Sequence, residues 1–121
     1  MIYFISTGKH LKIGYSVDPK GRLRELQTGN PLKLSIRATM PGSFQTETGL
    51  HELFAHLRCA GEWFKYTEEL KWFLCAVRDH RDEVNIKTLY MLSQKKRIAK
   101  KAKRLGKEHK LNKRIKAVSG L

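Results

Sequence analysis

The opening of the chain constrains its fold more than any other stretch. Residues 1–6 are rich in aromatic and β-branched side chains, a composition typical of a strand. Residues 7–10 contain a glycine, which supplies the positive φ that a tight turn needs. Residues 11–15 predict a strand that returns beside the first. The sequence therefore begins with a predicted β-hairpin.

The register of this hairpin determines which side chains share a face. A symmetric turn places Tyr3 opposite Gly14 and Ile5 opposite Lys12. Because side chains alternate along a strand, Tyr3 and Lys12 project from the same face. Gly14 has no side chain, so we expect open space beside the Tyr3 ring. A glycine that simply marks a bulge is the alternative interpretation.

A helix is predicted directly after the hairpin. Asp18 suits the N-cap and Pro19 the first helical position. Leu23 and Leu26 have the spacing of a buried face. Arg22 then falls in the first turns, close to the hairpin. Tyrosine, lysine and arginine side chains are thus expected near one another.

The next 60 residues continue the mixed pattern. An alternating run predicts a third strand, and later amphipathic runs predict helices. The predicted fold class is α+β: a small three-stranded antiparallel sheet flanked by helices, with a basic, partly helical C-terminal tail. The expected elements are a strand at 32–40, a helix at 44–58, a short aromatic strand or extended segment at 62–66, a helix at 68–81 and a further helix from 86.

One face of the predicted helix at 44–58 carries polar groups. Glu47, His51 and Arg58 are spaced to form a single narrow stripe. Arg58 and Glu62 are expected to form a structural ion pair nearby. Glu47 could equally be an ordinary solvated helix residue.

Basic residues are concentrated at the end of the chain. The net charge is +14, and residues 93–121 hold 12 Lys and Arg residues but one acid, Glu108. We therefore divide the chain into a domain at 1–85 and a nucleic-acid-binding tail at 86–121, because a basic tail most often serves a polyanion. A solvated, partly disordered extension is the alternative. The candidate nucleic-acid-binding residues are Lys95, Lys96, Arg97, Lys100, Lys101, Lys103 and Arg104.

Other features narrow the class of protein. Cys59 and Cys75 are too few for a disulfide framework and lie in apolar surroundings, so we expect buried free thiols. No signal-peptide pattern opens the chain, and no apolar run approaches the length of about 20 residues that a membrane span needs. We expect a cytoplasmic protein.

Several motifs, in this order and with these gaps, resemble the GIY-YIG nuclease superfamily. They are Tyr3 within IYFI, KIG at 12–14, Arg22, Glu47 with His51, and GEWF at 61–64. More narrowly, they resemble the phage and bacterial branch that has KIG in place of YIG. Lys12 stands where most of the superfamily has a tyrosine.

The resemblance implies phosphodiester hydrolysis with one divalent metal ion, Mg²⁺ or Mn²⁺. Glu47 would be the metal ligand, Tyr3 would activate or orient the attacking water, and Arg22 would hold the scissile phosphate. The candidate catalytic residues are Tyr3, Lys12, Arg22 and His51. For His51, the open roles are a partner of the metal ligand, a proton carrier or a surface histidine paired with Glu47.

The leading functional hypothesis is a metal-dependent endonuclease that cleaves DNA, with a basic tail on the phosphate backbone. A non-catalytic nucleic-acid-binding protein that retains the fold is the alternative. A basic protein that neutralises packaged nucleic acid is a third interpretation. The expected partner is DNA, and RNA fits the same chemistry. We expect no membrane partner, no obligate protein partner, and a location in the cytoplasm of a bacterium or phage-infected host.

Overall fold

The hairpin at the start of the chain forms with the predicted register. In the computed structural model, which describes the backbone of residues 1–119 and the side chains of residues 1–106, β1 (Ile2–Ser6) pairs antiparallel with β2 (His10–Tyr15). Tyr3 lies opposite Gly14, as predicted. Gly8 in the turn has a φ of 104°, a conformation that favours glycine.

Three more strands extend this hairpin into a sheet. They are β3 (Ser35–Met40), β4 (Arg58–Ala60) and β5 (Trp63–Lys65), and the strand order is β3-β1-β2-β5-β4, with antiparallel pairing throughout. The predicted α+β class is confirmed. The sheet has five strands where three were predicted, because β4 and β5 are each too short to show alternation in the sequence.

Helix α1 (Pro19–Gln27) begins as its sequence predicts. The Asp18 side chain accepts a hydrogen bond of 3.1 Å from the Gly21 backbone N–H, which caps the helix. A Cβ at Gly21 would overlap the Asp18 carboxylate. This overlap explains a glycine inside a helix, where it otherwise costs about 1 kcal/mol relative to alanine.

Helix α2 (Phe44–Leu53) is shorter than predicted. Ser43 caps it, but it ends at Leu53, and a 3₁₀ turn at Ala55–Leu57 leads into β4. The predicted single helix at 44–58 is wrong because the turn buries Phe54 and Leu57 and then directs the chain into the sheet. Arg58 therefore lies on a strand and does not share a stripe with Glu47.

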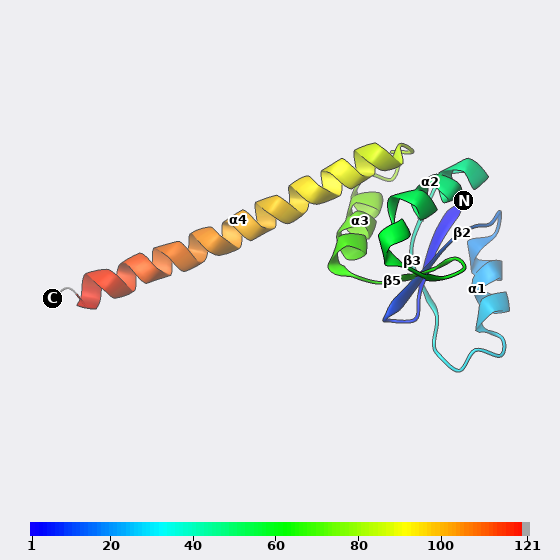
Figure 1. Cartoon of the computed structure of the whole chain (residues 1–121), viewed down its shortest axis with the longest axis horizontal. Coiled ribbons are helices and arrows are strands. Elements are labelled where there is room, and N and C mark those ends of the chain that lie inside the picture. Colours follow the sequence, from blue (N-terminus) through cyan, green and yellow to red (C-terminus); the bar gives the residue numbers. More distant parts are fainter. Residues whose placement is uncertain (120–121) are drawn as a thin grey trace.

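Helices cover both faces of the sheet (Figure 1). The larger core lies between one face and the helices α2, α3 (Glu68–Asp79) and the first turns of α4 (Ile86–Ser119). The smaller core holds Tyr3, Ile5 and Leu34 under α1. The two faces of the hairpin thus have different roles, and Tyr3 belongs to the α1 side.

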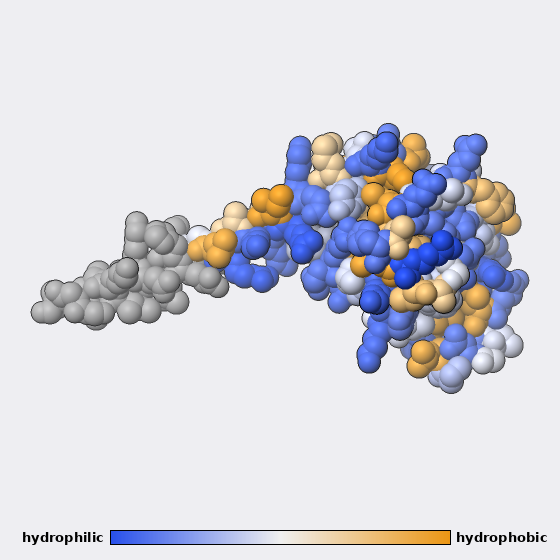
Figure 2. Space-filling model, in the orientation of Figure 1, coloured by the Kyte–Doolittle hydropathy of each residue, from blue (hydrophilic) through white to orange (hydrophobic). Residues whose placement is uncertain are grey.

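The C-terminal segment is helical, as predicted in part. Leu89 and Ser93 on α4 are fully buried against the domain, and the helix then projects away from it (Figure 1). Where its side chains are described, the projecting part shows hydrophilic and hydrophobic residues together, with Ile98 and Leu105 exposed among the basic side chains (Figure 2). No helix in the described part of the chain is long and apolar enough to cross a membrane.

Both cysteines are free, as predicted, but the prediction that both are buried is wrong. Cys59 is exposed and Cys75 is half-buried. Cys59 was expected in apolar surroundings, whereas it lies on β4 at the edge of the sheet.

Candidate functional site

The side chain of Tyr3, on β1, lies over Gly14 of the neighbouring strand β2. Its side chain is almost fully buried, at 2% exposure. A Cβ at Gly14 would overlap the Tyr3 hydroxyl and the ring carbon that carries it. The space that the sequence predicts beside the ring is therefore filled by the ring itself, and glycine is required because the hydroxyl rests directly on the β2 backbone.

Arg22 reaches this hydroxyl from α1. The hydrogen bond with Tyr3, followed by that with Glu25, raises the pKa of Arg22 above its usual value. The Arg22–Glu25 pair has an N–O distance of 2.9 Å. The Arg22 side chain is 41% exposed, so the guanidinium still faces solvent beside Glu25.

Lys12 is the buried cation of the site. It is 8% exposed, and its ammonium lies 2.9 Å from a Glu62 carboxylate oxygen. The same ammonium lies 5.6 Å from the centroid of the Trp63 ring, within the range of a cation–π contact. Lys12 and Trp63 are direct neighbours across β2 and β5, which explains why Glu62 reaches the lysine.

His51 joins α2 to the end of β2. Its Nε2 lies 2.8 Å from the Ile13 carbonyl oxygen, and because a carbonyl only accepts, Nε2 carries the proton. Its ring packs 5.1 Å from that of Phe64, and Nε2 is 3.8 Å from Glu47 Oε1. The Glu47 side chain is 13% exposed. His51 thus fixes the helix turn that carries Glu47.

Glu62 and His51 both form hydrogen bonds with the backbone of β2. Pairing between β2 and β5 ends at Lys12, and the next N–H, of Ile13, donates to the Glu62 carbonyl at 3.1 Å. The Ile13 carbonyl is taken by His51. Hence, in the part of the chain that the structure describes, no strand lies beside β2 beyond Lys12 on this edge, and Glu62 and His51 take the N–H and the carbonyl of Ile13.

The two carboxylates at this edge are in unequal environments. Burial raises the pKa of Glu47, and the charge and hydrogen bond of Glu62 raise it further. Burial acts in the same direction on Glu62, but the hydrogen bond and charge of Lys12 outweigh it, so the pKa of Glu62 is lowered. Glu47 is therefore the carboxyl that more readily keeps a proton.

This donor set fits a hard divalent cation better than zinc. No group of three or more His, Cys, Asp or Glu side chains able to hold a metal occurs among the described residues. Mg²⁺ is commonly held by one or two carboxylates and keeps several waters, whereas zinc sites use more nitrogen and sulfur ligands. Glu47 and Glu62 could supply such carboxylates, and a cation would relieve the crowding of their negative charges.

The predicted site residues form two groups, and the residues within each group lie close together. Tyr3 contacts Arg22, while Lys12, Glu47 and His51 gather around Glu62. Sequence reasoning missed Glu62 as a site residue because it assigned Arg58 as its partner. The predicted ion pair between Arg58 and Glu62 is wrong.

Arg58 instead donates from Nε to the Gly61 carbonyl at 2.6 Å. The signal that could have placed Glu62 correctly is the register of Trp63 opposite Lys12.

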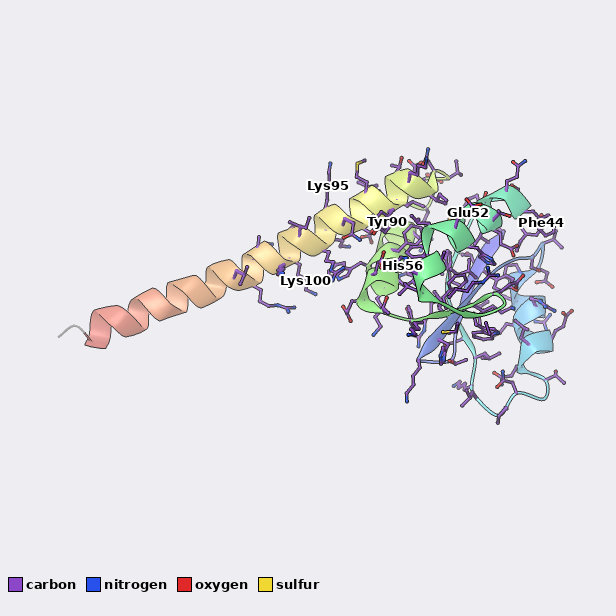
Figure 3. The ribbon with its side chains drawn as sticks, viewed as in Figure 1. Phe44, Glu52, His56, Tyr90, Lys95 and Lys100 are labelled. Atoms are coloured by element: carbon purple, nitrogen blue, oxygen red, sulfur yellow. The ribbon has the colours of Figure 1, made fainter. Side chains whose placement is uncertain are left out.

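The seven candidate basic residues of the tail are exposed on α4. Lys96 pairs with Asp79 of α3, and this contact raises the pKa of Lys96 and lowers that of Asp79. Lys100 lies over the ring of Trp72, with its ammonium 5.3 Å from the centroid. Lys95 and Lys100 point to different sides of α4 (Figure 3).

Comparison with known proteins gives one family. The model of the T5orf172 domain matches residues 1–86, which include all of the sheet and helices α1 to α3. No curated protein and no solved structure matched the chain. The chain belongs to the T5orf172 domain family, whose members are GIY-YIG-like and related to nucleases.

Proposed function

We propose that this protein is a metal-dependent endonuclease that hydrolyses phosphodiester bonds in DNA. The observation that carries the proposal is the convergence of the site on three consecutive residues of β2. Lys12 holds Glu62, the Ile13 backbone holds Glu62 and His51, and Gly14 lies under the Tyr3 hydroxyl. Membership of a nuclease-related family supports the same class of reaction.

Arg22 and Tyr3 are suited to the phosphate and the attacking water. A guanidinium is planar and permanently charged, so it can bind two oxygens of the scissile phosphate. The hydroxyl of Tyr3 lies near Arg22 and against the Gly14 backbone, and we propose that it orients water for attack at phosphorus. Attack by water forms the new P–O bond as the bond to the leaving oxygen breaks. The attacking water gives up a proton to the solvent, and the leaving oxygen takes one up.

Glu47 is proposed as the metal ligand, with Glu62 beside it. A bound Mg²⁺ or Mn²⁺ supplies positive charge that stabilises the pentacovalent phosphorane. Lys12 holds Glu62 through the 2.9 Å ion pair and so fixes the second carboxylate. His51 acts as a positioning residue, since its Nε2 proton is engaged by the Ile13 carbonyl.

The exposed basic residues of α4 are proposed to hold the phosphate backbone. Such contacts act without reading bases, and they make binding strongly dependent on salt. They would keep DNA on the protein while the site in the domain acts on one phosphate.

A non-catalytic nucleic-acid-binding protein is the second candidate. The observation that favours it is the Lys12–Glu62 pair, because a lysine neutralised by a carboxylate occupies the position where the superfamily generally has tyrosine. Such a protein would bind DNA through α4 and leave it intact with every metal.

Nicking of supercoiled plasmid separates the two candidates. The wild-type protein is incubated with Mg²⁺, Mn²⁺ or EDTA, beside Glu47→Ala and the matched variant Glu52→Ala. Glu52 is exposed on the same helix (Figure 3). We expect metal-dependent nicking by the wild type and by Glu52→Ala, and a loss of about 100-fold or more in Glu47→Ala. Nicking that survives Glu47→Ala contradicts the proposed metal ligand.

A further inference from the structure

A basic groove lies between α3 and α4, on a part of the molecule that the proposed reaction does not use. It has a volume of about 590 Å³. This volume is within the range of about 300–1,000 Å³ that small-molecule sites usually have. Its lining combines one indole ring with four lysines, and includes Trp72, Lys71, Lys96, Lys100 and Lys103.

The indole of Trp72 lies between two basic hollows. A smaller hollow of about 210 Å³ also includes Trp72 and Lys100, and adds Arg97, Lys101 and Arg104. Only one acid, Glu68, lines either hollow among the described residues. An aromatic surface between cations is suited to a ligand that is flat, apolar on its faces and negatively charged along its edge.

The two helices are joined firmly enough to form a built groove. Leu89 and Ser93 of α4 are fully buried, and the Tyr90 hydroxyl donates to Glu69 of α3 at 2.9 Å. Further along, Lys96 pairs with Asp79. These contacts fix α4 over α3 before it projects beyond the domain.

The α4 side of the groove lies beyond the matched domain. The family match ends at residue 86, whereas every α4 residue that lines the groove follows it. The sequence predicts phosphate contacts for these lysines but gives no reason to expect an aromatic ring among them, because Trp72 belongs to a different helix.

We propose that this groove binds an unpaired nucleotide of single-stranded DNA, with its base stacked on Trp72 and its phosphates on the surrounding lysines. The inference deepens the proposed function, since it rests on DNA as the partner, but it does not depend on cleavage. Bases stack on exposed aromatic side chains with little regard to sequence, and cationic grooves follow the backbone.

In the absence of a nucleotide, the Lys100 ammonium covers the face of the Trp72 indole on which a base would stack. Its ammonium lies over the Trp72 ring, 5.3 Å from the centroid, and is exposed. Base stacking on an aromatic ring is generally stronger than a cation–π contact at an exposed position. A base therefore displaces the ammonium from the ring, and the ammonium moves to a phosphate of the same strand.

The test compares two oligomers that carry the same charge. Full-length protein is titrated in EDTA, so that no cleavage occurs, with fluorescent oligothymidylate and with an abasic oligomer of equal length. We expect the wild type to bind oligothymidylate at least about fivefold more tightly. Trp72→Leu should lose this preference while its affinity for the abasic oligomer stays the same, and Trp72→Phe should keep most of it.

A pair of lysine variants tests the position of the phosphates. Lys95 and Lys100 lie on the same helix (Figure 3) and carry the same charge. Of the two, Lys100 lines the groove. We expect Lys100→Ala to weaken oligothymidylate binding several-fold more than Lys95→Ala. Because neither residue is in the core, these variants remain informative even if Trp72→Leu does not fold.

Three results would overturn the inference. They are equal wild-type affinity for the two oligomers, equal losses in the two lysine variants, and equally tight binding of polyglutamate, which would indicate an acidic protein segment as the occupant. Plasmid nicking with Mn²⁺ is measured separately. A protein that nicks plasmid but shows no base preference refutes the groove alone, whereas one that stacks bases but never nicks refutes the proposed enzyme alone.

Discussion

The ammonium of Lys12 lies 2.9 Å from the Glu62 carboxylate, and this pair joins the central hairpin to the edge of the sheet. Lys12 is 8% exposed, so its charge is largely removed from water. A buried charge is tolerated only with a partner. Glu62 is therefore part of the site, and Lys12 cannot be considered without it.

Removal of Glu62 should leave the Lys12 ammonium without its partner. We expect Glu62→Gln to lower the free energy of unfolding by about 1–2 kcal/mol in urea denaturation. Lys12→Met combined with Glu62→Gln should cost less than the sum of the two single changes. Glu52→Gln, on an exposed position of α2, is the control and should have little effect. If the loss of unfolding free energy in the double variant equals the sum of the two single losses, Lys12 and Glu62 are not coupled.

Glu47 should destabilise the fold at neutral pH. Burial and then the charge of Glu62 raise the pKa of Glu47 in the folded state. The folded state therefore favours the protonated carboxyl, and the penalty of ionisation is present above the raised pKa and disappears as the pH falls through it. We expect Glu47→Gln to raise the Tm at pH 7 in metal-free buffer, with a smaller gain as the pH is lowered through that pKa. An equal gain at every pH would exclude ionisation as the cause.

Gly14 should tolerate no side chain while Tyr3 is in place. A Cβ there overlaps the Tyr3 hydroxyl, which is packed under α1. We expect Gly14→Ala to lower the free energy of unfolding by about 1–3 kcal/mol, the usual cost of overpacking. Gly106 on α4 is the matched glycine, because a Cβ there meets no atom within 4 Å. Gly106→Ala should be neutral or stabilising, and a similar loss in both variants would contradict the steric explanation.

Arg22 should require its guanidinium and not merely its charge. Lysine keeps the charge but lacks the planar fork with which Arg22 is proposed to bind phosphate. We expect Arg22→Lys to lower the single-turnover rate of plasmid nicking by at least about tenfold. Arg24→Lys, an exposed change on the same helix, should leave the rate near that of the wild type. Equal nicking rates for the two variants would contradict a role for the Arg22 guanidinium in the reaction.

Local patterns predict the first part of this fold well. The register of Tyr3 and Gly14 follows from one symmetric turn, and the cap at Asp18 follows from two residues. These features depend on interactions between neighbours in the sequence. The same local rules bring Tyr3, Lys12 and Arg22 into one region of the predicted fold.

Features that depend on short elements could not be predicted in the same way. Strands β4 and β5 have three residues each, so alternation gives no signal. A 3₁₀ turn interrupts the apolar spacing that otherwise suggests a continuous helix to Arg58. Because the pairing of the two short strands and the end of the helix were not predicted, Glu62 was not placed in the site. Its position beside Lys12 depends on pairing between strands about 50 residues apart in the sequence.

Metal-dependent thermal stabilisation tests the proposed Glu47 site most directly. The Tm of the wild type, Glu47→Ala and Glu52→Ala is measured with increasing Mn²⁺, because a ligand that binds only the folded state raises its stability. We predict that Mn²⁺ raises the Tm of the wild type and of Glu52→Ala alike and leaves that of Glu47→Ala unchanged. An equal rise in all three proteins would contradict a metal site at Glu47.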